Sequence, residues 1–212
     1  MISKKTVRDV DLTDARVLMR VDFNVPMKDG VIQDDTRIIA ALPTIKYILE
    51  KKPRLLVLMS HLGDPKKDVQ KAKEKAEASG KSFDEKSFIE GKHKMKPVAE
   101  YLSKLLGREV LLSKDCISEE TQKMVLNLPN GAVLMLENTR FHKEETSKDE
   151  AEREKMAKIL AQYGDIYVND AFGTAHRAHA STETVAKFVK TAVAGFLMEK
   201  EVEYLGNAVS NP

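Results

Sequence analysis

The chain has 212 residues with a formal net charge of +2, which is too small to indicate binding to nucleic acid. Hydrophobic residues make up 42% of it and charged residues 32%, as in soluble globular proteins, and no apolar run approaches the ~18 residues that a membrane span needs. Its single cysteine, Cys116, excludes an internal disulfide, and no hydrophobic signal core follows the first residues, so we expect a cytoplasmic protein that binds no membrane.

Short apolar runs alternate with helical patterns along the chain. The runs rich in β-forming residues predict strands over Arg16–Val21, Leu55–Met59, Glu109–Leu112, Ala132–Leu136 and Asp165–Val168. The segments between them predict helices over Thr36–Lys51, Val98–Leu106 and Ala151–Tyr163. This order predicts a Rossmann-like α/β fold, in which a mostly parallel sheet carries helices on both faces as a three-layer sandwich.

Local signals predict where the helices begin and end. Gly107 is expected to close the second helix and Gly164 the third. Ser147 and Glu150 have the S-x-x-E spacing of a capping box, which predicts the start of the third helix. Pro43, inside the first helix, predicts either a kink or a later start of that helix.

The stretch Asp64–Lys96 interrupts this alternation. It holds ten lysines and seven acidic residues and has no apolar periodicity before Met95. We expect residues 64–95 to form a lysine-rich, solvated and partly disordered insertion rather than an interaction module. Its tripeptide GKS at 80–82 resembles the end of a P-loop, but Lys75 stands where that motif needs glycine. No G-x-G-x-x-G occurs either, so the chain has no recognisable nucleotide-phosphate cradle of its own.

Polar side chains follow four of the predicted strands. Carboxyl ends of parallel strands meet at one edge of a sheet, where open α/β sheets bind ligands. Guanidinium groups suit phosphate and carboxylate groups, and a glycine lets backbone N–H groups approach an anion. We therefore predict an anion-binding crevice at this edge. It would be formed by Asp22, Asn24 and Arg37 after the first strand, His61 and Gly63 after the second, Arg140 after the fourth and Arg177 after the fifth.

The segments that carry these residues resemble, in order and in spacing, the N-terminal half of the phosphoglycerate kinase family. The resemblance extends over essentially the whole chain. It rests on Arg20–Pro26 (RVDFNVP), Asp35–Ile38 (DTRI), Ser60–Gly63 (SHLG), Lys96–Ala99 (KPVA), Leu136–Phe141 (LENTRF), Asp165–Thr182 and Gly195–Leu205 (GFLMEKEVEYL).

The resemblance implies a phosphotransferase with a carboxyl group as acceptor. Members of the family move a phosphoryl group between the carboxylate of 3-phosphoglycerate and ADP or ATP in glycolysis, with Mg²⁺. They have two Rossmann-like domains joined by a helix and a hinge, and the C-terminal domain binds the nucleotide. Residues 1–188 would form the N-terminal substrate-binding domain, and residues 189–212 the interdomain helix or linker leading to a nucleotide-binding domain absent from this chain.

This division implies that the chain alone is an inactive monomer. It would bind 3-phosphoglycerate or 1,3-bisphosphoglycerate, while Mg-ATP or Mg-ADP would belong to the full-length enzyme and no cofactor or metal to this chain. Its protein partner would be its own C-terminal domain. The alternative is a stand-alone phosphoglycerate-binding or regulatory domain without catalysis, and a reading frame that continues past Pro212 would exclude it.

The resemblance also implies a role for each residue of the crevice. Asp22 and Asn24 would orient the hydroxyl and the carboxyl end of the substrate. Arg37 would lie beside the carboxylate and stabilise the transferred phosphoryl group, as the catalytic residue of this half. The 3-phosphate would be bound by His61, Arg140 and Arg177, and Gly63 completes the substrate-binding set.

One position departs from the family pattern. The family segment SHLGRP is SHLGDP here, so Asp64 stands where an arginine usually helps to bind the phosphate. A carboxylate ~6 Å from a phosphate charge costs up to ~3 kcal/mol at an effective dielectric constant of ~20. Three outcomes are open: Asp64 points away, Lys66 or Lys67 replaces the arginine, or the affinity is lower.

Other polar residues are expected to be structural. Arg20, flanked by apolar residues, is predicted as a paired, buried arginine, and His142 as a solvated surface histidine. Glu137 and Asp170 are assigned to loop scaffolding, because a carboxylate that accepts a phosphoryl group is already ionised and needs no strong base. Cys116 is predicted as a core or near-surface residue, since no spacing links it to a histidine.

His176 and His179 have the H-x-x-H spacing of some metal ligands. No third ligand at metal spacing accompanies them in the sequence. A role in stabilising a turn or in lying near the phosphate is therefore predicted in preference to zinc binding.

Overall fold

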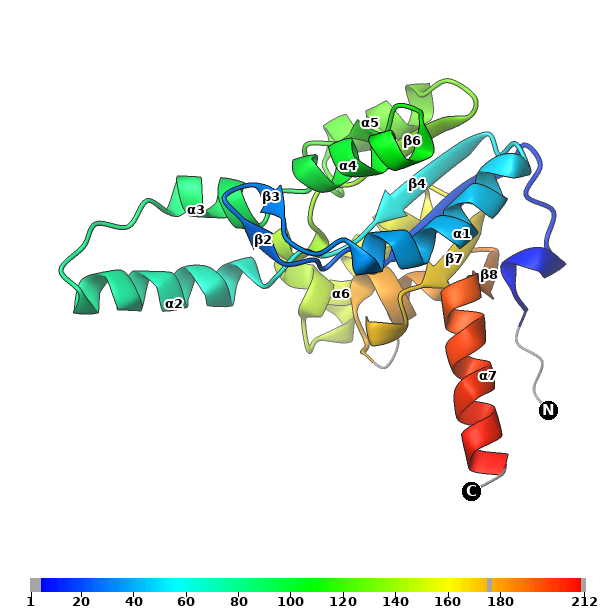
Figure 1. Ribbon diagram of the computed structural model, residues 1–212. Helices are drawn as coiled ribbons and strands as arrows, with labels where there is room; N and C mark the ends of the chain where they lie inside the picture. Colours follow the sequence, from blue (N-terminus) through cyan, green and yellow to red (C-terminus); the bar gives the residue numbers. More distant parts are fainter. Residues whose placement is uncertain (1–4, 175–176, 211–212) are drawn as a thin grey trace.

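A six-stranded parallel sheet forms the centre of the molecule (Figure 1). The computed structural model describes residues 5–174 and 177–210. The strand order is β5-β6-β4-β1-β7-β8, and each adjacent pair runs parallel. The strands are β1 (Arg16–Val21), β4 (Leu55–Met59), β5 (Leu111–Leu112), β6 (Ala132–Met135), β7 (Ile166–Asp170) and β8 (Thr191–Ala194).

Helices surround the sheet, and a small hairpin of β2 (Met27–Lys28) and β3 (Val31–Ile32) follows β1. The α-helices are α1 (Thr36–Glu50), α2 (Pro65–Ala78), α3 (Glu85–Lys92), α4 (Lys96–Leu106), α5 (Glu119–Asn127), α6 (Glu150–Ala161) and α7 (Phe196–Ser210). Shorter helical turns are η1 (Val7–Asp9), η2 (Thr139–Phe141), η3 (Lys143–Thr146), η4 (Phe172–Thr174) and the π-helical η5 (Ala180–Thr184). Within the described part of the chain, no helix is long and apolar enough to cross a membrane.

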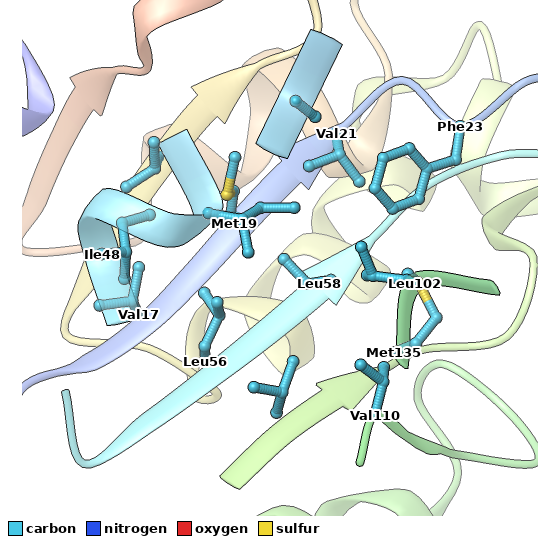
Figure 2. Close-up of a cluster of buried hydrophobic side chains, with 14 of the residues drawn as sticks. Val17, Met19, Val21, Phe23, Ile48, Leu56, Leu58, Leu102, Val110 and Met135 are labelled. Atoms are coloured by element: carbon cyan, nitrogen blue, oxygen red, sulfur yellow. The ribbon is translucent and has the colours of Figure 1, made fainter. Parts of the chain in front are cut away.

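Alternation along the strands creates a core on each face of the sheet. In β1, Val17 and Met19 face the core beneath α1 and α4, whereas Leu18 faces the core beneath α5 and α6. In the first core, Ile48 of α1 and Leu102 of α4 pack with the strand residues (Figure 2). The two cores give the three-layer α/β sandwich that the order of strands and helices predicts.

The strands of the central sheet largely follow the sequence prediction. β1 and β4 have the predicted ends, β5 and β6 differ from the prediction by one or two residues at one end, and β7 differs at both ends. β8 is not predicted, because its sequence TAVA is short and half alanine, and pairing with β7 makes it a strand. It adds residues 191–194 to the sheet, beyond residue 188, the expected end of the substrate-binding domain.

Two predicted helix ends have a different physical basis. Asp149 caps α6 by accepting a hydrogen bond from Ala151 N at 3.0 Å, so the capping box predicted at Ser147 is wrong. Gly164 is not in the left-handed region that a C-terminal glycine adopts. A Cβ at that position would lie 2.7 Å from Leu18 N, so close packing against β1 requires the glycine.

The remaining helix-end predictions concern α4 and α1. Gly107 has a φ of 63° and ends α4 as a left-handed cap, as predicted. α1 begins at Thr36 and continues through Pro43, so a later start is wrong. The carbonyl that loses its intrahelical donor belongs to Ile39, an exposed residue, where water can replace the lost bond.

The lysine-rich insertion is helical, so the prediction of partial disorder is wrong. α2 and α3 occupy it and project from the body of the molecule (Figure 1). Each begins with an aspartate cap: Asp64 accepts from Lys67 N at 3.3 Å, and Asp84 from Ser87 N at 3.2 Å. Lysine, glutamate and alanine are strong helix formers, so these caps start helices that need little core. α3 has no buried residue, whereas α2 buries Pro65 and Val69.

Candidate substrate-binding site

The polar residues that follow the strands gather at the carboxyl edge of the sheet. Asp22 and Asn24 follow β1, His61 and Gly63 follow β4, and Arg140 lies in η2 after β6. β1 lies beside β4, and β4 beside β6, so the loops that carry these residues are neighbours. The structure thus brings together side chains that are more than a hundred positions apart in the sequence.

Arg37, in the first turn of α1, is held at this edge by Asp22. Its Nη1 lies 2.5 Å from Asp22 Oδ2, and this ion pair joins the loop after β1 to α1. The Asp22 side chain is 12% exposed and that of Arg37 is 52% exposed. The partly buried carboxylate therefore orients a guanidinium that still faces solvent and can donate to an anionic ligand.

Gly63 links the loops after β1, β4 and β6. Its N–H donates to Asn24 Oδ1 at 2.7 Å, and its carbonyl accepts from Arg140 Nη1 at 3.0 Å. Its φ of +64° is left-handed, and a Cβ would lie 2.7 Å from the His93 ring. Glycine is therefore required here, and its flanking peptide groups align Asn24 with Arg140.

Arg140 is more buried than Arg37, and Asp64 faces it. The Arg140 side chain is 13% exposed, and burial lowers its pKa, while the nearby charge of Asp64 acts in the opposite direction. Asp64 Oδ2 lies 3.9 Å from Arg140 Nη1 and 3.5 Å from Lys67 Nζ. Asp64 therefore points toward Arg140, not away from it.

His61 is a buried, neutral histidine. It is 4% exposed, and its Nδ1 lies 3.1 Å from Arg20 Nη2. Burial, followed by the charges of Arg20 and Arg140, lowers the pKa of His61 to about 2. The ring therefore adds hydrogen-bonding capacity to the site and no charge at neutral pH. Arg20 is fully buried, as the sequence predicts.

Arg177 and His179 follow β7. Arg177 is exposed. The pKa of Arg140 is affected first by its own burial, then by Asp64, and then by the positive charge of Arg177, which lowers it further. His179 is buried, and its N–H donates to Thr182 Oγ1 at 3.2 Å in the turn that begins η5. His176 lies outside the described residues. Among residues 5–174 and 177–210, no three His, Cys, Asp or Glu side chains are placed to hold a metal ion.

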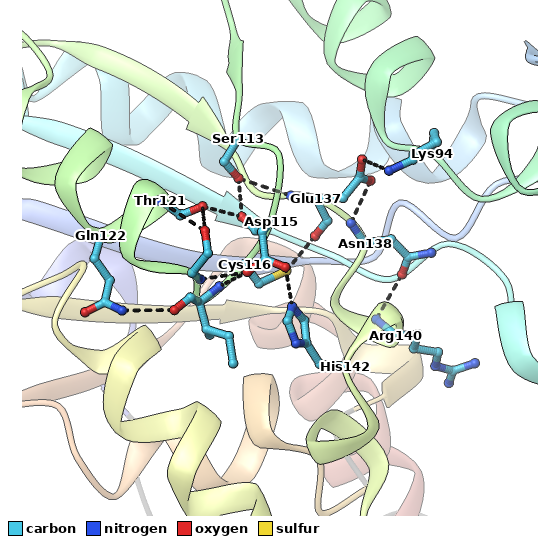
Figure 3. A network of polar contacts seen from close by, with 12 residues as sticks. Lys94, Ser113, Asp115, Cys116, Thr121, Gln122, Glu137, Asn138, Arg140 and His142 are labelled. Atoms are coloured by element: carbon cyan, nitrogen blue, oxygen red, sulfur yellow. Dashed lines mark hydrogen bonds and ion pairs between the residues drawn. The ribbon is translucent and has the colours of Figure 1, made fainter. Parts of the chain in front are cut away.

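Glu137 and Asn138 form a scaffold next to Arg140 (Figure 3). Glu137 Oε1 accepts from the N–H groups of Met95 and Asn138, both at 2.9 Å. Asn138 Oδ1 accepts from Leu62 N and Arg140 N, both at 3.1 Å. These contacts confirm the scaffolding role of Glu137. They also show that Asn138, to which the sequence assigned no role, joins the loops after β4 and β6. The position of Asn138 soon after β6 is the sequence feature from which this role could have been predicted.

The neighbourhood of the scaffold corrects one prediction and confirms another. His142 is not a solvated surface residue: its side chain is 17% exposed, and its Nε2 lies 3.0 Å from Asp115 Oδ2 (Figure 3). No spacing in the sequence relates these two positions. Cys116 is a core residue, since it is fully buried, its thiol donates to Glu137 O at 2.8 Å, and burial raises its pKa.

Asp170 anchors α7. It is fully buried, and burial raises its pKa. Its Oδ1 accepts from Leu197 N at 2.8 Å and from Met198 N at 3.3 Å, which caps the start of the helix. A Cβ on Gly195 would collide with this carboxylate, so the chain must be glycine where it passes Asp170. The scaffolding role expected of Asp170 is the one it has.

Comparison with known proteins connects this edge with an enzyme family. A family model described as phosphoglycerate kinase matches residues 7–212. The chain belongs to the phosphoglycerate kinase family. The phosphoglycerate kinase of Treponema pallidum (strain Nichols) is 52% identical over 208 residues, which are 98% of this chain and 49% of the relative. The cytosolic phosphoglycerate kinase 3 of Arabidopsis thaliana is 50% identical over 208 residues, 98% of this chain and 45% of the relative.

Solved phosphoglycerate kinases share the fold. The structure from Coxiella burnetii has a TM-score of 0.76 at 36% identity, and the match covers 99% of this chain and 46% of the Coxiella chain. The structure from Pyrococcus horikoshii has a TM-score of 0.78 at 34% identity, and the match covers 96% of this chain and 45% of the Pyrococcus chain. The chain thus spans about half the length of the curated relatives it matches and corresponds to the N-terminal half of the phosphoglycerate kinases.

Proposed function

We propose that this chain binds 3-phosphoglycerate or 1,3-bisphosphoglycerate at the carboxyl edge of its sheet, as the substrate-binding half of a phosphoglycerate kinase. The proposal is carried by the linked set in which Asp22 orients Arg37 and Gly63 joins Asn24 to Arg140. Arg140 Nε adds a buried donor that has no partner among the described residues. A phosphate carries about −1.5 to −2 charges at pH 7 and offers three acceptor oxygens, which such donors suit.

Each residue has a task in this proposal. Asp22 and Asn24 orient the hydroxyl and carboxyl end of the substrate, and Arg37 lies by the carboxylate and stabilises the phosphoryl group in transfer. The phosphate at the other end is bound by His61, Gly63, Arg140 and Arg177. In the forward reaction of a kinase, a carboxylate oxygen of the substrate forms a bond to the terminal phosphorus of ATP as the bond to ADP breaks. Positioning and charge stabilisation supply most of such catalysis.

Mg-ATP or Mg-ADP is assigned to a second, C-terminal domain of the full-length kinase. The described residues bring no set of metal-ligating side chains together, and the sequence has no glycine-rich phosphate cradle. The chain alone is expected to be inactive.

The division between the two domains is proposed to fall after β8. Residues 1–194 would form the substrate-binding domain, because β8 pairs with β7, and the linker would begin at Gly195. α7 would then be the interdomain helix, and its exposed Val202 and Tyr204 would meet the second domain. A cytoplasmic monomer that binds neither nucleic acid nor membrane completes the proposal.

Titration of the chain with 3-phosphoglycerate at low salt tests the proposal. Saturable heat is expected for the parent and should be lost when Arg37→Ala and Arg177→Ala are combined. The matched control combines Lys46→Ala with Lys155→Ala, which removes two exposed positive charges on α1 and α6 and should leave binding intact. If the folded parent does not bind, the proposal fails for this chain.

One observation favours the second candidate, a stand-alone phosphoglycerate-binding or regulatory domain. Asp64 replaces the arginine of the family pattern and faces Arg140, which would weaken a catalytic substrate site. A parent reading frame that continues into a nucleotide-binding domain would exclude this candidate.

A further inference from the structure

The contact between Arg20 and His61 determines which nitrogen of the histidine carries its proton. His61 Nδ1 lies 3.1 Å from Arg20 Nη2, and both side chains are buried. A guanidinium has five N–H donors, no acceptor and a pKa above ~12, so it cannot accept a hydrogen bond from the ring. Nδ1 must therefore be the acceptor. A neutral imidazole with an unprotonated Nδ1 carries its one proton on Nε2.

Arg20 is held in place for this contact by a second buried residue. Its Nε donates to Ser181 Oγ at 2.9 Å, and its Nη1 donates to the carbonyl of Val21. Ser181 Oγ in turn donates to Glu145 Oε1 at 2.5 Å, and Ser181 N donates to Glu145 Oε2 at 2.9 Å. Glu145 is fully buried, so its carboxylate balances the charge of Arg20 through one serine.

We propose that Arg20 is a positioning residue that fixes His61 as the neutral Nε2–H tautomer, so that this histidine meets a phosphate as an N–H donor and the arginines supply the charge. The part of this inference that concerns phosphate rests on the proposed function. The tautomer itself does not, because it follows from contacts in the unliganded chain. Ser181 and Glu145 contribute to this positioning, since they hold the guanidinium of Arg20 that selects the tautomer.

The surroundings of His61 keep the ring neutral. The groups that act on it are Arg20 on β1, Arg37 on α1, Arg140 on η2 and His179 before η5. The three arginines are cations, and burial acts in the same direction, so the pKa of His61 is lowered to about 2. A histidine with the ordinary pKa of 6.5 titrates near neutral pH, whereas His61 stays neutral throughout that range.

Nitrogen NMR of the unliganded chain tests the tautomer directly. With ¹⁵N-labelled protein, and His61→Gln to assign the resonances, we expect an imine-type signal for Nδ1 and a pyrrole-type signal for Nε2. Neither signal should move between about pH 5.5 and pH 8, the range in which a free histidine titrates. A pyrrole-type Nδ1, or a titration in that range, would overturn the inference even if the chain binds 3-phosphoglycerate.

Substitution of Arg20 tests whether it is responsible. In Arg20→Met no guanidinium donates to His61 Nδ1, so we expect a mixture of tautomers. The affinity for 3-phosphoglycerate should be lower by roughly tenfold, the effect of one hydrogen bond to a charged group. If Arg20→Met does not fold, Ser181→Ala, which keeps the guanidinium but removes its link to Glu145, should show a smaller change of the same kind. An unchanged tautomer and affinity in the folded variant would overturn the positioning role. If the parent chain shows the expected tautomer signals but does not bind 3-phosphoglycerate, the result would count against the proposed function alone.

Discussion

At the level of single residues, the carboxylate of Asp64 takes part both in a helix cap and in the proposed site. It caps α2 through the N–H of Lys67, and it faces the guanidinium of Arg140 at 3.9 Å. The cap stabilises the insertion, whereas the carboxylate offsets the charge that Arg140 would offer to a phosphate. The same side chain therefore supports the local helix and weakens the proposed site.

Asp64→Asn should tighten the binding of 3-phosphoglycerate, by roughly five- to tenfold, because asparagine keeps an N-cap but removes the competing charge. Asp64→Arg should also tighten binding but should lose the cap, which costs α2 about 1 kcal/mol. Calorimetric titration compares the affinities. Asp84→Asn, the equivalent change at the cap of α3, is the control and should bind as the parent does. Equal affinities for the parent, Asp64→Asn and Asp64→Arg would rule out this role of Asp64.

At the level of secondary-structure elements, the attachment of α7 depends on a buried carboxylate. Asp170, at the end of β7, accepts two N–H groups from the first turn of α7, and the N–H of Phe196 donates to Thr44 Oγ1 of α1 at 3.1 Å. The start of α7 is therefore fixed to both β7 and α1.

The ionisation of Asp170 should make this attachment depend on pH. Burial raises the pKa of Asp170 above its ordinary value of 3.8, so the folded chain binds this proton more tightly than the unfolded chain does. The ionised form thus costs stability above the folded-state pKa, and the cost disappears as the pH falls toward 3.8. Asp170→Asn, which keeps the Oδ1 acceptor, should raise the free energy of unfolding at neutral pH, by an amount that shrinks as the pH is lowered.

Urea unfolding at neutral pH and at a series of lower pH values toward 3.8 measures this effect. The control is Asp149→Asn, which changes the exposed cap of α6 in the same way and should shift stability little at any of these pH values. A gain for Asp170→Asn that does not depend on pH would contradict the argument.

At the level of the whole molecule, the insertion forms an arm outside the sandwich (Figure 1). Lys73 of α2 pairs with Glu85 of α3 at 2.6 Å, which brings the two helices together near the tip. The arm joins the body at its base, where the N–H of Gly30 donates to Gly91 O at 2.8 Å and the buried His93 packs beside Gly63. The base of the arm therefore lies beside Gly63, a residue of the proposed site.

Replacing residues 74–83 with a short Gly-Ser linker, which keeps the Asp84 cap of α3, should leave the domain intact. The linker would join Lys73 to Asp84, whose neighbour Glu85 already pairs with Lys73, and most of the removed residues are exposed. We expect a change in the free energy of unfolding of less than ~1 kcal/mol and an unchanged affinity for 3-phosphoglycerate. Thermal unfolding and titration measure both. A large loss of stability would mean that the tip supports the core.

Local patterns were sufficient for much of the fold. Buried parallel strands form continuous apolar runs, so β1 and β4 could be located to the residue, and the order of strands and helices predicts the three layers. Patterns failed where structure depends on a distant partner or on helix propensity without a core. β8 is a strand because β7 lies beside it, and α2 and α3 are helices without a regular apolar face.

The candidate site divides in the same way. Which residues collect at the carboxyl edge of the sheet was determined by the sequence alone, because chain order and strand direction place every loop after a strand on that side. Their pairing was decided only by the tertiary structure: Arg20 with His61, Asp64 with Arg140, and Asp170 with the start of α7. Such pairs join residues from different elements, and their burial determines the charge and the proton positions of the site. No local pattern in a sequence records these properties, since they arise only when the elements pack together and exclude water.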